Sequence, residues 1–222
     1  MHGLGPRVFF TPPRSWDPGE MNSLLLAAVL IAQGAQAQRT VVFLGDSLTA
    51  GLGLPRKDAF PALIEARIRQ AGLGWRVVNA GVSGDTSAGA RARLDWVFKD
   101  QPDLLFLCIG SNDGLRGLPV KELEANLRAI LDRAKKENCR VVLAGAMLPD
   151  NYGPEYREAF RAVYPRLARA YRLPFLPFLL EGVALRPELN QEDGIHPNAA
   201  GARRIADLLW KVMEPELQAR PR

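Results

Sequence analysis

Short apolar runs alternate with amphipathic segments between residues 40 and 214, and this alternation limits the folds open to the chain more than any other feature. The runs have the length and β-branched composition of buried strands, whereas the segments between them repeat apolar residues at helical spacing. Such alternation predicts an α/β fold in which helices cover both faces of a five-stranded parallel sheet. We expect strands at residues 40–44, 75–79, 103–109, 140–145 and 174–177. We expect the longer helices at residues 60–68, 120–134, 156–171 and 199–213.

The length of 222 residues, 47% of them apolar, suits one domain with a sizeable core, which we place at residues 38–222. Ahead of it, residues 24–32 form a short apolar stretch, and Gly34-Ala35-Gln36-Ala37 offers a small-residue cleavage site. This pattern is typical of a secretory signal peptide, and the stretch is shorter than the roughly 20 apolar residues of a membrane span. We therefore expect residues 1–37 to be a leader, with Met21–Ala37 as the signal, and the protein to be secreted or periplasmic. A retained membrane anchor is the alternative, because no Lys or Arg lies between Met21 and the apolar stretch.

Charge and the scarcity of metal ligands argue against several classes of partner. The formal charge of +5 is spread along the sequence, and no run of Lys or Arg interleaved with aromatics suggests a nucleic-acid surface. One histidine outside the leader, with scattered carboxylates, argues against a catalytic metal. Gly51-Leu52-Gly53 begins like a dinucleotide loop but lacks the third glycine, so we expect no cofactor. Cys108 and Cys139 lie on expected core strands, and we interpret them as small buried hydrophobes.

Polar residues interrupt the apolar pattern at the ends of the expected strands. The first strand runs directly into Gly45-Asp46-Ser47, where turn chemistry follows the apolar run. Because the carboxyl ends of parallel strands meet at one edge of a sheet, all five such loops should converge there. The loops are residues 45–47, 79–86, 110–114, 147–153 and 191–197. An ordinary strand-to-helix turn, capped by Asp46 or Ser47, is the alternative for the first loop.

Ser47, His196 and Asp193 carry the groups that nucleophilic catalysis needs. A serine is a weak nucleophile until a base, usually a histidine held by a carboxylate, takes its proton. His2 lies in the leader, so His196 is the only histidine in the remaining chain. Asp193 precedes it by three residues, and a bent loop would let this carboxylate accept from Nδ1 while Nε2 faces Ser47. The alternative is that Asp193 caps the final helix beside an ordinary loop histidine, but a position opposite the Ser47 loop favours catalysis.

Hydrolysis of an acyl bond also requires donors aimed at the developing oxyanion. Gly84 can present a backbone N–H at close range, the N–H of Ser47 can supply a second donor, and the side-chain amide of Asn112 a third. Each has a structural alternative, since Gly84 and the Asn112-Asp113-Gly114 sequence also suit turns. The meeting of four such loops at one sheet edge is less easily explained by turns alone. We expect Asp46 to brace its turn rather than to act as the catalytic acid.

Four blocks of the sequence contain these residues, in the order of the expected strands. They are Gly45-Asp46-Ser47-Leu48, Gly84 within residues 81–86, Gly110-Ser111-Asn112-Asp113 and Asp193-Gly194-Ile195-His196-Pro197. Jointly they resemble the SGNH (GDSL-type) hydrolase family, and the resemblance covers about residues 40–214. It implies a flavodoxin-like three-layer α/β/α architecture, Ser47 as nucleophile, and Ser47, Gly84 and Asn112 as oxyanion donors. The motifs at residues 83–86, 112–117, 148–153 and 193–198 look like the bacterial secreted branch, whose members act as acyl thioesterases, arylesterases and lysophospholipases.

Apolar residues on two of the loops bear on the substrate. They are Leu115 and Leu118 after the Asn112 turn, and Met147, Leu148, Pro149 and Tyr152 after the fourth strand. They can line an open groove for an acyl chain or cover the sheet edge as ordinary packing. The resemblance favours the groove, so we expect a hydrolase of small-molecule acyl esters or thioesters, lysophospholipids included. We also expect the protein to be a monomer.

Two other functions stay open. A small-ester or carbohydrate deacetylase would use the same catalytic groups. An aromatic platform for sugars would favour this function, but Trp75 and Trp96 fall in strand and helix patterns instead. A non-catalytic lipid-binding envelope protein would tolerate loss of the serine or the histidine, whereas this chain retains both.

Overall fold

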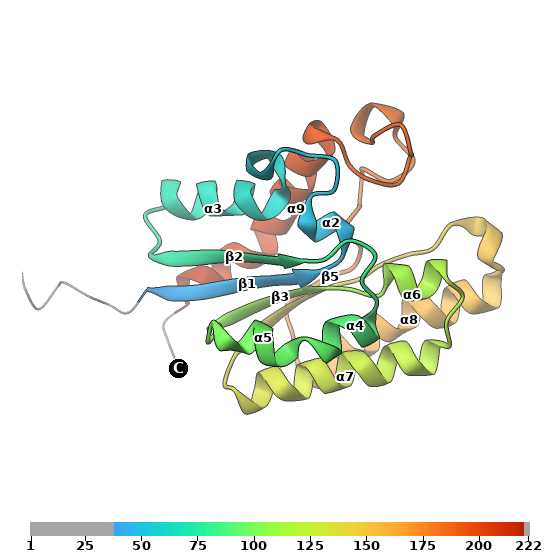
Figure 1. Cartoon of the computed structure of the whole chain (residues 1–222), viewed down its shortest axis with the longest axis horizontal. Coiled ribbons are helices and arrows are strands. Elements are labelled where there is room, and N and C mark those ends of the chain that lie inside the picture. Colours follow the sequence, from blue (N-terminus) through green and yellow to red (C-terminus); the bar gives the residue numbers. More distant parts are fainter. Residues whose placement is uncertain (1–37, 220–222) are drawn as a thin grey trace, which may run out of the picture. The chain divides into compact units, whose positions relative to one another are not determined.

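The computed structural model of the protein describes residues 38–219. The leader and signal peptide expected at residues 1–37 lie outside the described residues. The described part contains a five-stranded parallel sheet with the strand order β2-β1-β3-β4-β5 (Figure 1). The strands are β1 (Arg39–Gly45), β2 (Trp75–Gly81), β3 (Leu104–Cys108), β4 (Arg140–Ala144) and β5 (Phe175–Leu176). This is the order of a flavodoxin-like sheet, so the expected fold class is confirmed.

Helices cover both faces of this sheet (Figure 1). α3 and α9 pack on one face, and α4, α5, α7 and α8 pack on the other. The helices are α2 (Ser47–Ala50), α3 (Phe60–Gln70), α4 (Ser87–Ala92), α5 (Leu94–Lys99), α6 (Ser111–Leu115), α7 (Val120–Lys136), α8 (Pro154–Tyr171) and α9 (Ala199–Gln218), with short 3₁₀ turns η1 (Arg56–Asp58), η2 (Asp150–Tyr152) and η3 (Pro187–Leu189). The four expected long helices are confirmed, whereas the expectations did not include α2, α4, α5 and α6. No helix within residues 38–219 is long and apolar enough to cross a bilayer.

The strand that leads to Ser47 is packed on both of its faces, because side chains along a strand alternate in direction. Val42 and Leu44 pack on the face of α7 and α8, while Val41 and Phe43 pack on the face of α3 and α9. All four side chains are at most 1% exposed, and burying side chains of this size contributes about 1.5–3 kcal/mol each. The end of β1 is therefore a rigid support for the loop that follows it.

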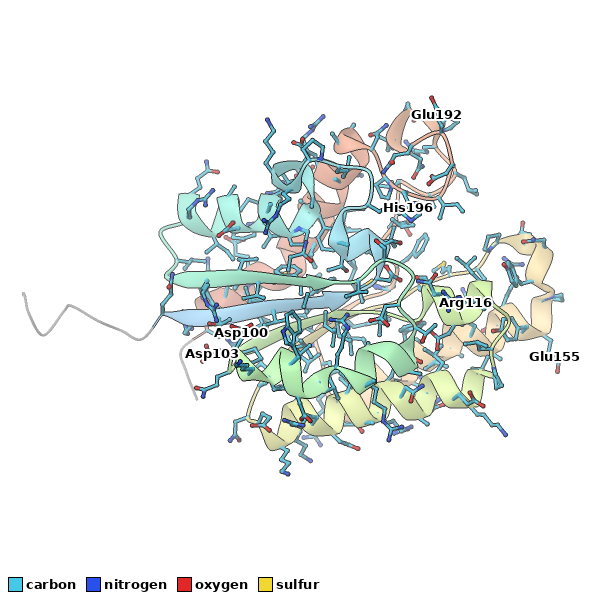
Figure 2. The ribbon with its side chains drawn as sticks, in the orientation of Figure 1. Asp100, Asp103, Arg116, Glu155, Glu192 and His196 are labelled. Atoms are coloured by element: carbon cyan, nitrogen blue, oxygen red, sulfur yellow. The ribbon has the colours of Figure 1, made fainter. Side chains whose placement is uncertain are left out.

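The strands end together at one edge of the sheet. Gly45 at the end of β1 is in register with Gly81 at the end of β2 and with Cys108 at the end of β3. The connections that follow these strands therefore start side by side, as the sequence predicts. Figure 2 shows His196 and Arg116 at this edge, and Asp100 and Asp103 at the opposite one.

Candidate active site

Ser47 is the first residue of α2 and follows the end of β1 after a single intervening residue. That residue, Asp46, caps the helix, because its Oδ1 accepts a hydrogen bond of 3.1 Å from the N–H of Leu48. Gly45 is needed for close packing: a Cβ there would lie 2.6 Å from a backbone oxygen of β3. Asp46 thus braces the turn, as expected, and the sharp exit from the strand leaves the half-buried Ser47 side chain at the sheet edge.

His196 lies between Ser47 and Asp193 in one line of hydrogen bonds. Its Nε2 is 2.8 Å from Ser47 Oγ, and its Nδ1 is 2.6 Å from Asp193 Oδ2. The other carboxylate oxygen of Asp193 accepts the backbone N–H groups of Ile195 and His196, each at 2.9 Å. The loop bends at Gly194, whose φ of +71° favours glycine. The predicted contacts among these three side chains are therefore present.

The hydrogen bonds at Asp193 also fix its protonation state. The backbone N–H of His196, then the His196 side chain and the N–H of Ile195, lower the pKa of Asp193 to about 2. The carboxylate stays ionised near neutral pH, so it can orient the imidazole and stabilise it when it carries a proton. The His196 side chain is 18% exposed and that of Asp193 is 46% exposed, so the pair remains accessible to solvent.

Gln191 ties the histidine loop to the serine loop, a role that the sequence did not reveal. Its Nε2 donates to the carbonyl oxygens of Leu52 at 2.7 Å and Pro197 at 3.0 Å. Its backbone N–H donates to the carbonyl of His196 at 2.8 Å. Gly53 makes room for this side chain, since a Cβ there would lie 2.1 Å from Gln191 Oε1. One side chain thus holds two loops that are far apart in the sequence.

Gly84 lies in a tight turn that follows β2. The N–H of Asp85 closes the turn by donating to the carbonyl of Val82 at 3.1 Å. Gly84 has a φ of +80°, whereas Ser83 has no positive φ, which is the pattern of a type II turn. A Cβ at Gly84 would have 3.7 Å to its nearest neighbour. The backbone conformation, not the lack of space, therefore requires glycine here, and it sets the direction of the Gly84 N–H.

Asn112 is the second residue of α6 and reaches across to the Gly84 turn. Its Nδ2 donates to the carbonyl oxygen of Asp85 at 2.9 Å. A side-chain amide carries two N–H groups, so this bond orients the nitrogen and leaves its second N–H for another acceptor. Arg116, at the end of the same helix, donates from Nη2 to the carbonyl of Gly84 at 2.8 Å. Two side chains from one short helix thus hold the turn.

Asp46 is a second carboxyl group close to the site, and its environment is opposite to that of Asp193. Burial raises the pKa of Asp46 to about 6, although the N–H of Leu48 and the nearby His196 lower it. The side chain is buried, and its Oδ2 has no hydrogen-bond partner among the described residues. Asp46 therefore changes charge around pH 6.

The apolar residues expected to bind substrate differ in how far they reach solvent. Leu115, Met147 and Pro149 are exposed, Leu118 and Tyr152 are half-buried, and Leu148 is only 7% exposed. Leu148 packs in the core against Phe160 and Gly114. The Tyr152 hydroxyl donates to the carbonyl of Leu115 at 2.9 Å, which joins the two loops.

The space beside Ser47 is small. The apolar cavity lined by Ser47, His196, Phe60 and Ile205 has a volume of ≈ 10 Å³, which is room for about one water. This cavity is too small to hold an acyl chain. Within the described residues no group of three or more His, Cys, Asp or Glu side chains is placed to hold a metal ion. Cys108 and Cys139 are free and buried, and burial raises the pKa of both thiols.

The geometry and the fold together define a class of protein. The family model described as "GDSL-like Lipase/Acylhydrolase family" matches residues 43–204. The chain belongs to this family and is an ester hydrolase of the SGNH type.

Two curated relatives are similar over most of their length. The chain is 42% identical to "Esterase TesA" of Pseudomonas aeruginosa over 86% of this chain and 96% of that protein. It is also 42% identical to "Thioesterase 1/protease 1/lysophospholipase L1" of Escherichia coli K12, over 86% of this chain and 90% of that protein.

Solved structures agree with the fold. The crystal structure of TesA has a TM-score of 0.77 and 41% identity, covering 80% of this chain and 99% of that one. The psychrotrophic esterase EstA of Pseudoalteromonas sp. has a TM-score of 0.77 and 30% identity, covering 82% of this chain and 100% of that one.

Proposed function

We propose that the chain hydrolyses carboxylic esters and thioesters of acyl groups through an acyl-enzyme on Ser47. The observation that carries the proposal is the unbroken line of hydrogen bonds from Ser47 Oγ through His196 to Asp193. His196 Nε2 accepts the hydroxyl proton while Oγ bonds to the carbonyl carbon, and Asp193 stabilises the imidazolium. The tetrahedral intermediate then expels the alcohol or thiol, which takes the proton from Nε2. A water molecule, activated by the same histidine, releases the acid and restores Ser47.

In this proposal the charge that develops on the carbonyl oxygen is stabilised by three donors. They are the backbone N–H groups of Ser47 and Gly84 and the side-chain amide of Asn112. The direct bond from Asn112 to the carbonyl of Asp85 supports a shared site, because it joins the amide to the turn that holds Gly84. The hydrogen bonds from these donors strengthen as the oxygen gains charge, so they stabilise the transition state more than the bound ester.

The distribution of exposed apolar side chains supports an acyl chain as part of the substrate. Seven large apolar side chains are exposed within residues 38–219, and only Trp96 lies on a helix that covers a face of the sheet. The other six belong to the connections that leave the carboxyl ends of the strands: Leu52, Val82, Leu115, Met147, Leu185 and Ile195. Exposed apolar side chains on these connections suit contact with an alkyl chain.

The names of the relatives extend the proposal to particular esters. The Escherichia coli relative is named a thioesterase and lysophospholipase, and a relative from Vibrio mimicus, 35% identical, is named an arylesterase. We therefore propose medium or long acyl esters, acyl thioesters and lysophospholipids as substrates.

Replacing the nucleophile tests the proposal. Ser47→Ala should abolish hydrolysis of p-nitrophenyl acyl esters, with an unchanged circular dichroism spectrum and thermal midpoint. Wild-type rates in the variant would overturn the mechanism. A panel of p-nitrophenyl esters from acetate to palmitate, beside a lysophospholipid and an acyl thioester, tests the substrate class. A preference for acetate would favour the small-ester or carbohydrate deacetylase instead.

We also propose that residues 1–37 direct the chain out of the cytoplasm and that the mature protein acts as a monomer. Support for the first point is the apolar stretch and the Ala35-Gln36-Ala37 cleavage pattern. Support for the second is that Ser47, His196 and Asp193 all come from one chain. Amino-terminal sequencing should find Gln38 first, and light scattering should give the mass of one chain. An uncleaved protein in the membrane fraction would indicate an anchor.

A further inference from the structure

Arg93 and Asp85 form a shielded ion pair next to the loops that carry the oxyanion donors. Arg93 lies between α4 and α5, and Asp85 directly follows Gly84. The distance from Arg93 Nε to Asp85 Oδ2 is 2.8 Å, and the side chains are 19% and 10% exposed. Neither side chain has a part in the hydrolysis described above.

The guanidinium of Arg93 also holds the end of the strand that leads to Ser47. Its Nη2 donates to the carbonyl oxygen of Gly45 at 3.2 Å. The same oxygen accepts the N–H of Val82 at 3.1 Å, and Val82 opens the turn that contains Gly84. Two donors on one carbonyl therefore fix the backbone before Ser47 relative to the Gly84 turn.

Asp85 completes the connection to the other two donors. Its N–H closes the Gly84 turn with a hydrogen bond of 3.1 Å, and its carbonyl oxygen accepts from Asn112 Nδ2 at 2.9 Å. Its carboxylate pairs with Arg93. Arg93 and Asp85, through side chains and backbone together, thus contact all three segments that supply the N–H groups of Ser47, Gly84 and Asn112.

We propose that Arg93 is a positioning residue, which, paired with Asp85, holds the three oxyanion donors at the spacing that the tetrahedral intermediate requires. The inference rests on the proposed function. A shielded ion pair adds little net stability by itself, because desolvation offsets much of the attraction between the charges. Its bonds to Gly45 and to the Gly84 turn act on geometry instead, and an error of about 1 Å in the position of a catalytic group can lower a rate by about 10²-fold.

A matched ion pair elsewhere in the chain separates positioning from stability. Arg140 Nη1 is 3.0 Å from Glu216 Oε2, with side chains that are 17% and 26% exposed. This pair lies at the start of β4, at the edge of the sheet opposite the active site. Arg140→Met should therefore lower the thermal midpoint much as Arg93→Met does, without the effect on catalysis.

The test compares Arg93→Met and Arg140→Met in the hydrolysis of p-nitrophenyl butyrate, per active site counted with a fluorophosphonate. Arg93→Met should lower kcat by about 10- to 100-fold and change KM by less than about 3-fold, because the donors act on the transition state. Arg140→Met should keep the wild-type kcat. An alkyl trifluoromethyl ketone, which forms a tetrahedral adduct on Ser47, should lose affinity for Arg93→Met by the factor lost in kcat/KM, whereas an alkanoate product should not.

Further variants keep the test decisive if Arg93→Met does not fold. Arg93→Lys retains the charge, but one ammonium nitrogen cannot reproduce the geometry of both guanidinium bonds, so its kcat should fall below that of the wild type. Adding Asp85→Asn to Arg93→Met or to Arg93→Lys should lower kcat by no more than the larger of the two single substitutions does, because the two residues act as a unit.

Unchanged kcat in the folded Arg93 variants would overturn the inference, as would a loss of kcat without loss of affinity for the ketone. A wild-type protein unable to hydrolyse any ester would overturn the proposed function and this inference with it, so the two failures are distinguishable.

Discussion

The pKa values of two carboxyl groups close to His196 are shifted in opposite directions by their surroundings. Three hydrogen bonds keep Asp193 ionised, with a pKa of about 2, whereas burial raises the pKa of Asp46 to about 6. Between pH 5 and 8 the charge of Asp193 is therefore constant, and that of Asp46 becomes more negative as the pH rises. The charge of Asp46 is therefore one source of any change in activity across this range.

We predict that kcat/KM falls as the pH is lowered from 8 to 5, because only a neutral His196 can accept the proton of Ser47. Asp46→Asn removes the charge change of Asp46 and keeps an oxygen that can accept from the N–H of Leu48, so the fall in kcat/KM should persist in this variant. The measurement is kcat/KM for a p-nitrophenyl ester across the range, in both proteins. A flat profile in Asp46→Asn would assign the pH dependence to Asp46 and contradict the role of His196.

Among the elements, the turn after β2 depends on one glycine conformation. Gly84 has a φ of +80°, and other residues lose about 1–2 kcal/mol in this region. A side chain there would favour a type I turn, in which the central peptide is flipped and its N–H points elsewhere. Gly72, in the connection between α3 and β2, has a φ of +67°, and a Cβ added there would meet no atom within 4 Å. Replacing Gly72 with alanine should therefore cause the same backbone strain far from the active site.

We predict that Gly84→Ala lowers kcat by about 10²- to 10³-fold, the usual loss of one oxyanion donor. Both Gly84→Ala and Gly72→Ala should lower the free energy of unfolding by about 1–2 kcal/mol. Gly72→Ala should leave kcat unchanged. Urea unfolding and steady-state kinetics of both variants make the comparison. Equal kcat values in the two variants would remove the N–H of Gly84 from the mechanism.

The sequence predicts the strands and the long helices well and the short helices poorly. Strands such as 140–145 show as runs of apolar, partly β-branched residues, and helices such as 120–134 are long enough for their apolar spacing to repeat. α2, α4, α5 and α6 have four to six residues, which is too short for a helical repeat to be visible. Leu148 illustrates a second limit, since an apolar residue in a loop can face the solvent or the core, and only the packing against Phe160 decides.

At the scale of the whole molecule, the sheet brings together residues that are distant in the chain. Ser47 and His196 are 149 positions apart, yet the common edge of a parallel sheet was enough to predict their meeting. The supports of the site were not predictable in this way. Gln191 reaches a carbonyl 139 positions away, and Arg93 one that is 48 positions away. Such bonds to backbone oxygens leave no residue pattern in the sequence.

The proposed mechanism requires that hydrolysis pass through an ester bond between the acyl group and Ser47. The most direct test is to quench the protein during turnover of a slowly deacylated p-nitrophenyl ester and to map the modified peptide by mass spectrometry. We predict the mass of one acyl group on the peptide that contains Ser47, and none in Ser47→Ala. Turnover with the acyl group on a different residue, or undiminished hydrolysis by Ser47→Ala, would contradict the account.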